Sequence, residues 1–136
     1  MKTCLFLFSN IQWIWLAVAV IVTFAIGAIW YSYLFPKTWV RVFKVEMPEK
    51  VTTLSMVKTM SMQLIVNIFF GTLFFMLTQI SFVLSVFTLI CFCGWQKGGL
   101  YFQFPKWKDY VQAACIQTGY TFIAGMVFII FGLISR

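Results

Sequence analysis

The chain has 136 residues, of which 62% are hydrophobic and 10% are charged, and its mean hydropathy is +0.97. A soluble domain needs far more polar residues to cover its surface, so this composition excludes one and predicts an integral membrane protein. The net charge of +7 falls mainly in two short loops, where membrane topology accounts for it. We therefore expect no nucleic-acid partner.

Four apolar segments are long enough to cross a bilayer, which takes about 20 mostly apolar residues. The expected spans are residues 11–35, 60–79, 81–104 and 110–134, with loops at 36–59 and 105–109. Their apolar runs are continuous rather than alternating, which favours helices over a barrel. The sequence predicts an all-α integral membrane protein in which residues 1–136 form a single bundle of four transmembrane helices.

The stretch from Gly27 to Trp39, which reads GAIWYSYLFPKTW, covers the end of the first span. Pro36 suits the first position of a new helix, in which Lys37, Arg41 and Lys44 share one face and apolar residues the other. We expect a short amphipathic helix in the membrane interface, its cations towards anionic lipid headgroups; an aromatic ligand pocket is the alternative. The residues expected at this headgroup interface are Trp30, Tyr31, Lys37, Trp39, Arg41, Lys44, Lys106, Trp107 and Lys108.

The same stretch resembles the G-x-x-W-Y-S…F…W signature of a family of small bacterial membrane proteins, the domain-of-unknown-function family numbered seventeen sixty-one. A second block, LYFQFPKWKDYVQAACIQTGY, is similar to that family's aromatic helix end, basic loop and Gly-Tyr-containing last helix. The matching positions are Gly27, Trp30, Tyr31, Ser32, Phe35 and Trp39, then Leu100, Phe104, Lys106, Gly119 and Tyr120. Pro105 stands where family members often have an acidic residue. The resemblance implies a four-helix protein of the bacterial cytoplasmic (inner) membrane and implies no activity.

Basic residues predict the orientation of the spans. Eight of the ten lysines and arginines lie in or beside the two loops, whereas Lys2 and Arg136 lie near the termini. The positive-inside rule places the two basic loops in the cytoplasm and both termini outside.

Each span also carries polar or small residues at helical spacing. The candidates for lining a solute path or for bonding between helices are Gln63, Asn67, Thr78, Ser85, Thr88, Lys97, Gln117 and Thr121. Gln63 and Asn67 lie one turn apart, and two carboxamides facing lipid are costly, so they face a helix, a ligand or water. Lys97, the single charge inside a span, either snorkels to the interface or holds a headgroup or anion.

The sequence lacks the residues that several kinds of catalytic and metal-binding site require. The sequence has no histidine, and its three acids, Glu46, Glu49 and Asp109, lie in or near loops. This excludes a histidine zinc site, a Ser-His-Asp arrangement and a carboxylate relay through the membrane. Methionine and cysteine ligands suit Cu(I), but ordinary packing explains them better. We expect no enzyme, no cofactor and no metal.

Two functional classes remain. The first is an oligomeric passive channel or small-solute/anion transporter, lined by Gln63 and Asn67 with Lys97 at its cytoplasmic mouth. Four spans are too few for an inverted-repeat transporter, so we expect a homo-oligomer. The alternative is an accessory protein without transport activity that binds lipid or a partner membrane protein through its aromatic and basic rim.

Overall fold

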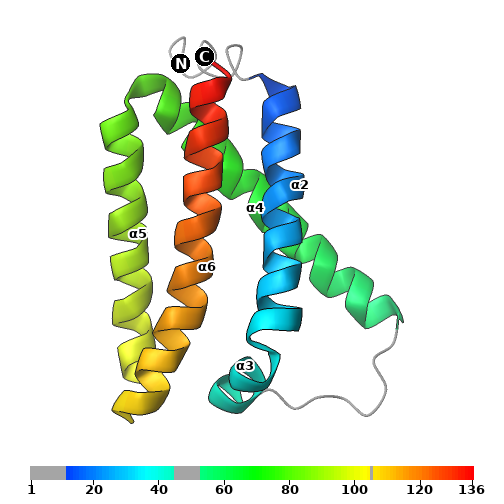
Figure 1. Ribbon diagram of the computed structural model, residues 1–136, viewed down its shortest axis with the longest axis vertical. Coiled ribbons are helices and arrows are strands. Elements are labelled where there is room, and N and C mark those ends of the chain that lie inside the picture. Colours follow the sequence, from blue (N-terminus) through cyan, green and yellow to red (C-terminus); the bar gives the residue numbers. More distant parts are fainter. Residues whose placement is uncertain (1–11, 45–52, 105) are drawn as a thin grey trace.

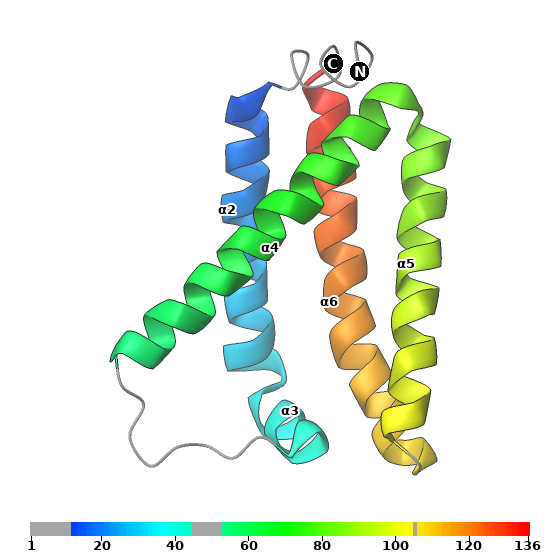
Figure 2. The same ribbon diagram turned by 180° about the vertical axis from the view of Figure 1, so that it is seen from behind.

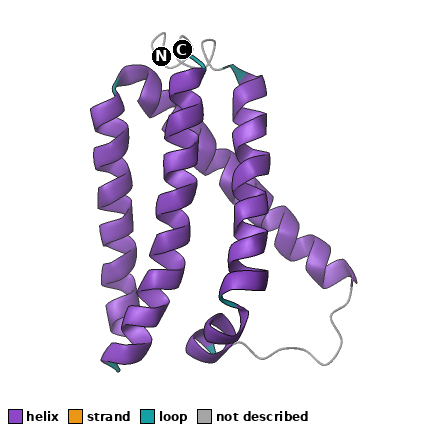
Figure 3. Ribbon diagram, in the orientation of Figure 1, coloured by secondary structure: helices purple, strands orange, loops and turns teal. Residues whose placement is uncertain are grey.

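The computed structural model describes residues 12–44, 53–104 and 106–136. In these ranges every regular element is a helix (Figure 3). The elements are α2 (Trp13–Ile29), its π-helical continuation η1 (Trp30–Leu34), α3 (Pro36–Phe43), α4 (Thr53–Ile80), α5 (Phe82–Gln103) and α6 (Trp107–Ile134). Four of the helices are long and apolar enough to cross a membrane. The prediction of an all-α, multi-pass membrane protein with a short helix after the first span is confirmed.

The four long helices alternate in direction, so α2 begins and α6 ends at the same end of the bundle (Figure 1). The opposite end, called the lower end here, holds α3 and the connection between α5 and α6. Helices α2, α5 and α6 run side by side, whereas α4 crosses them diagonally and swings away at its first half (Figure 2). The described parts of both predicted basic loops therefore lie towards the lower end of the molecule (Figure 1).

Close packing around α6 holds the bundle together in its upper half. A Cβ added at Gly71 of α4 would lie 2.5 Å from Cε1 of Phe128, and one added at Gly125 would collide with Leu89 of α5. Small residues let membrane helices approach closely enough for such side chains to fill the interface. The resulting core of Phe74, Phe75, Leu89, Phe128 and Ile129 is fully buried.

Thr78 and Ser85 join α4 to α5 beside their tight turn. Their hydroxyl oxygens lie 3.2 Å apart, so one hydroxyl can donate to the other while the second donates to a backbone carbonyl nearby, that of Phe74 for Thr78 (2.6 Å) or that of Ser81 for Ser85 (2.9 Å). Both side chains are fully buried. Of the two roles predicted for these residues, the structure supports bonding between helices.

The helices extend further into the predicted loops than expected. Helix α4 begins at Thr53 rather than near residue 60, and α6 begins at Trp107 rather than near residue 110. Neither added segment contains proline or glycine, and Asp109 in the first turn of α6 is stabilised by the positive end of the helix dipole. The loops predicted at 36–59 and 105–109 are therefore shorter, and Trp107 and Lys108 are helical.

Helix α3 lies across the lower end of the bundle (Figure 1). Its apolar face packs against the ends of α5 and α6, where Val42 joins a buried cluster with Leu100, Ala113 and Ala114. On the opposite face Arg41 is exposed and donates from Nη2 to Oε1 of Gln112 at 3.0 Å. The predicted amphipathic helix thus exists, and its apolar face packs on α5 and α6.

Candidate functional site

A cavity of about 500 Å³ lies in the lower half of the bundle, beneath the diagonal of α4 and above α3. Residues of α2, η1, α3, α4 and α6 line it. Its polar lining residues are Tyr31, Ser32, Thr59, Gln63, Gln117 and Tyr120. We call it the aromatic cavity. The first half of α4, which diverges from α2 and α6 in Figure 2, contributes Thr59, Met60 and Gln63 to its lining.

Aromatic rings form one wall of the cavity. The Tyr31 ring meets the Tyr120 ring edge-on at a centroid distance of 5.4 Å and the Trp39 ring at 6.2 Å. Trp39 in turn stacks on Phe43, 6.2 Å away along α3. These contacts link η1, α3 and α6, so the short helix fixes one side of the cavity.

Two glycines allow this wall to form. A Cβ added at Gly27 would lie 2.9 Å from the hydroxyl oxygen of Tyr120, and one added at Gly119 would lie 3.0 Å from Cζ2 of Trp30. Trp30 also donates from its indole nitrogen to the carbonyl oxygen of Ile116 at 2.9 Å. Trp30 and Tyr31, which the sequence placed at the lipid headgroups, are half-buried and contact α6, and their position relative to the headgroups stays a prediction. The contacts form because η1 turns their rings towards α6, where the small Gly119 makes room.

Of the two carboxamides on α4, that of Gln63 lines the cavity and that of Asn67 is buried between helices. Gln63 is exposed, lines the cavity and donates from Nε2 to Oδ1 of Asn67 at 3.5 Å. Asn67 is only 4% exposed, and its Nδ2 has no hydrogen-bond partner among the described residues. Both carboxamides lie close to the hydroxyl of Tyr120, which donates to the carbonyl oxygen of Thr23 at 3.4 Å. The Tyr120 hydroxyl oxygen is a nearby acceptor for these amide groups, and Asn67 itself does not line the cavity.

The cavity is uncharged. None of the described residues that line it is acidic or basic. Lys97, predicted at the mouth of a path lined by Gln63, lies instead in a separate groove between α5 and α6. Gln63 and Gln117 thus share one site, and Lys97 belongs to another.

The remaining predicted polar residues lie outside the cavity lining. Thr121 is buried and donates to the carbonyl oxygen of Gln117 at 3.0 Å, as a packed membrane threonine commonly does. Thr88 is half-buried on α5.

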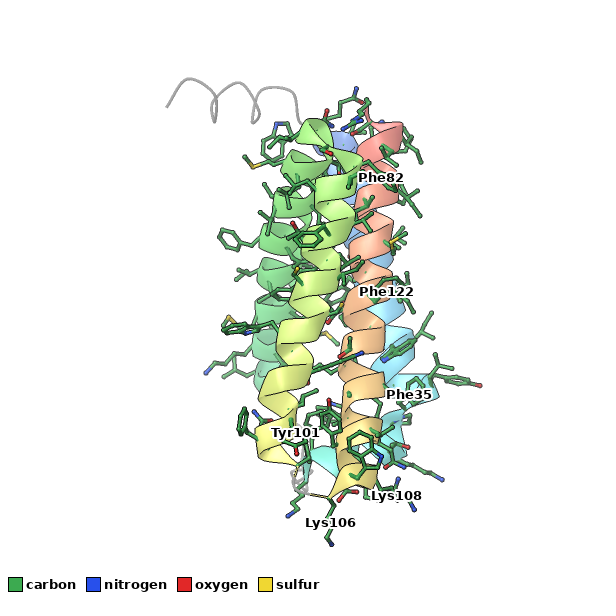
Figure 4. The ribbon with its side chains drawn as sticks, turned by 90° about the vertical axis from the view of Figure 1, so that its left-hand side faces the viewer. Phe35, Phe82, Tyr101, Lys106, Lys108 and Phe122 are labelled. Atoms are coloured by element: carbon green, nitrogen blue, oxygen red, sulfur yellow. The ribbon has the colours of Figure 1, made fainter. Side chains whose placement is uncertain are left out.

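Most of the predicted interfacial residues lie at the lower end. Lys106 and Lys108 mark that end in Figure 4, and Lys37, Lys44 and Trp107 are likewise exposed. Their contact with anionic headgroups stays a prediction.

Tyr120 lines the cavity but was not among the site residues predicted from the sequence. It appeared only as part of the resembling second block, because a tyrosine in the middle of an apolar helix has no distinctive spacing. The useful signal was its position three residues after Gln117, which puts both polar groups on one face of a helix.

The two sequence blocks of the resemblance meet in space. Gly27 and Trp30 from the first block contact Tyr120 and Gly119 from the second. Comparisons of the chain with family models, curated proteins and solved structures find no match. Membership of the resembling family therefore stays a prediction.

Proposed function

We propose that this protein is a non-enzymatic membrane protein that binds an uncharged amphiphile in the aromatic cavity. One observation carries the proposal: a cavity of about 500 Å³, uncharged and lined by both aromatic rings and hydrogen-bonding groups, lies beside the membrane-facing surface. Small-molecule sites typically enclose roughly 300–1,000 Å³ and combine apolar walls with a few polar groups that fix orientation.

The lining favours a neutral head group with hydroxyl or carbonyl oxygens. The carboxamides of Gln63 and Gln117 and the hydroxyl of Tyr31 supply donors and acceptors without net charge. A charged head group would lose its hydration there without gaining a counter-charge, which is costly in a low-dielectric site. The rings of Tyr31 and Trp39 provide flat apolar contact for the adjoining part of the ligand.

Entry from the bilayer fits the surroundings of the cavity. Ala28, Ser32, Met60 and Gln63 all line it and are all exposed, so the cavity opens where the first half of α4 diverges from α2 (Figure 2). With the basic lower end in the cytoplasm, as the positive-inside rule suggests, the ligand would come from the cytoplasmic leaflet. The proposal follows the family resemblance in placing the protein in the bacterial inner membrane, and the positive-inside rule in placing both termini outside.

Passage through a single chain has less support than binding. Above the cavity the space between the helices is filled by the buried rings of Phe74, Phe75 and Phe128. An oligomeric channel for small solutes or anions, which would need its path between copies, stays a prediction, as does a partner membrane protein.

Fluorescence quenching tests the binding directly. We would reconstitute the protein in nanodiscs and titrate in a monoacylglycerol brominated on its acyl chain, because bromine quenches tryptophan on contact. Gln63→Leu combined with Gln117→Leu removes two hydrogen-bonding groups and is expected to weaken binding roughly tenfold or more. Trp39→Phe should remove a large part of the quenching, because Trp39 lines the cavity.

Gln103→Leu is the matched control, since Gln103 is exposed at the end of α5 and does not line the cavity. It should bind the probe as the wild type does. Equal binding by the double variant and the control would refute the proposal, as would quenching that Trp39→Phe leaves unchanged.

A further inference from the structure

A groove lies on another side of α6 and, unlike the aromatic cavity, is lined by a charged side chain. This α5–α6 groove has a volume of about 740 Å³ and is lined on α5 by Ile90, Cys93, Gly94 and Lys97. Helix α6 contributes Tyr110 at its lower end, Thr118 further up and Phe122 near mid-height. Figure 4 faces this side of the molecule, with Phe122 on α6 beside α5 and Lys106 and Lys108 at the lower end.

Lys97 lies inside the span rather than at its end. Two contacts give the antiparallel register of α5 and α6: Leu89 packs at Gly125, and Leu100 packs with Ala113 and Ala114. In this register Lys97 lies level with Thr118. Lys97 is six residues from the end of α5 at Gln103, which corresponds to about 9 Å at the rise of an α-helix. Its ammonium group makes no ion pair with any residue that the structure describes, and no described acidic side chain lines the groove. A lysine whose backbone lies at this depth either extends its exposed side chain towards the interface or holds an anion.

A second unsatisfied group lies at the same level. Thr118 is 9% exposed and lines the groove, and its hydroxyl oxygen has no hydrogen-bond partner among the described residues. A threonine hydroxyl donates readily to an anionic oxygen. Lys97 and Thr118 together provide a positive charge and a donor on facing walls.

The groove also has room for a chain. A Cβ added at Gly94, which lines the groove, would meet no atom within 4 Å, and Gly98, one turn further along α5, also faces open space. Towards mid-height the lining becomes apolar, with Ile90 and Phe122, whereas Tyr110 lies at the lower end, near the expected headgroup level. The groove thus runs from a polar mouth past a cation to an apolar end, which matches the order of parts in a phospholipid.

We propose that the α5–α6 groove binds an anionic phospholipid, with its phosphate at Lys97 and Thr118 and an acyl chain along Gly94, Ile90 and Phe122. A second copy of the chain is the less favoured occupant of this glycine-lined face. A symmetric contact between two α5 helices would bring two Lys97 cations together with no acid in the groove to offset them. This site is separate from the aromatic cavity and does not depend on its proposed ligand.

Native mass spectrometry of the full chain in detergent tests the site. The probes are phosphatidylglycerol, phosphatidylcholine with the same acyl chains, and sodium phosphate. We expect phosphatidylglycerol to bind more tightly than phosphatidylcholine, and Lys97→Gln to weaken phosphatidylglycerol binding about tenfold through loss of a charge-assisted hydrogen bond. Lys58→Gln removes the same charge from an exposed site on α4 outside the groove and should leave binding unchanged.

A second variant tests the groove without touching the charge. Gly94→Leu with Gly98→Leu fills open space, so the protein should fold normally and lose the bound phosphatidylglycerol. The proposal is overturned if Lys97→Gln and Lys58→Gln behave alike, or if the filled variant still binds the lipid. It is also overturned if sodium phosphate displaces the lipid at equal concentration, which would indicate a free-anion site. Loss of a dimer from the spectrum of the filled variant would overturn it in favour of a second copy.

Discussion

Trp30 is half-buried and donates a hydrogen bond from its indole nitrogen to the carbonyl oxygen of Ile116. Trp30→Phe keeps a ring against Gly119 and loses that bond. We expect it to lower the free energy of unfolding by about 1 kcal/mol, measured by titration with denaturing detergent. Trp95→Phe is the control, because Trp95 is 83% exposed and should change stability little. Equal losses in both variants would show that the indole bond contributes nothing.

Gly27 is the residue that keeps Tyr120 in place against α2. Gly27→Ala puts a methyl group 2.9 Å from the tyrosine hydroxyl, so the ring must move away from Thr23 and reshape the cavity. We expect brominated monoacylglycerol to bind several-fold more weakly, with stability lower by about 1–3 kcal/mol from overpacking. Gly98→Ala, which meets open space, should keep wild-type binding. Unchanged quenching in Gly27→Ala would mean that Tyr120 does not shape the site.

The sequence predicted the unusual polar residues but not what each of them faces. Gln63 and Asn67 stood out because carboxamides are expensive in lipid, and one does line the cavity while the other is buried. Trp30 and Tyr31 were placed at the headgroups by a general preference of aromatic residues. The preference does not predict their contacts with α6, because a single sequence does not reveal which helix is adjacent.

At the scale of elements, the number and type of helices followed from the length of the apolar runs. The residues at which the helices begin could not be predicted in this way. Helices α4 and α6 include polar segments at their beginnings, where the hydropathy is low but the backbone is still helical. The amphipathic helix α3 was predicted from Pro36 and the spacing of its cations. Its packing on α5 and α6 depends on the small residues Ala113 and Ala114, whose role appears only once the helices are in place.

The α5–α6 interface depends on a glycine, which gives a prediction for this pair of helices. Gly125→Ala places a methyl group in direct collision with Leu89, a fully buried side chain. The helices must separate, and we expect a loss of about 1–3 kcal/mol in unfolding free energy.

Gly94→Ala on the open side of α5 is the matched control for this interface. It should leave stability unchanged or raise it by up to about 1 kcal/mol, because alanine favours the helix more than glycine does. If both alanine variants were equally stable, close packing at Gly125 would not hold these helices together.

For the whole molecule, the even number of spans puts the beginning of α2 and the end of α6 at one end (Figure 1). The side of the membrane that this end faces is a prediction from the basic residues. In a chain whose native cysteines are replaced by alanine, Arg136→Cys should react with an impermeant maleimide on intact cells. Lys108→Cys should react only after the cells are opened. The reverse pattern would invert the topology and place the ligand entry in the outer leaflet.

From the sequence, an aromatic ligand pocket at residues 27–39 was only the alternative to a membrane anchor, and its other walls could not be predicted. The apolar runs indicate four helices of spanning length, but not the steep angle at which α4 crosses the others (Figure 2). That angle is set by packing of Gly71 against Phe128 and Gly132 against Thr78, contacts between residues far apart in the sequence.

The most direct test of the proposed function is to identify what the cavity holds when the protein leaves its own membrane. We would extract wild type and the Gln63→Leu, Gln117→Leu double variant in polymer-bounded native nanodiscs and compare their lipids by mass spectrometry. The account predicts one uncharged amphiphile enriched over the bulk membrane in the wild type and depleted in the double variant, with phospholipids unchanged. Identical lipid profiles for the two proteins would contradict it.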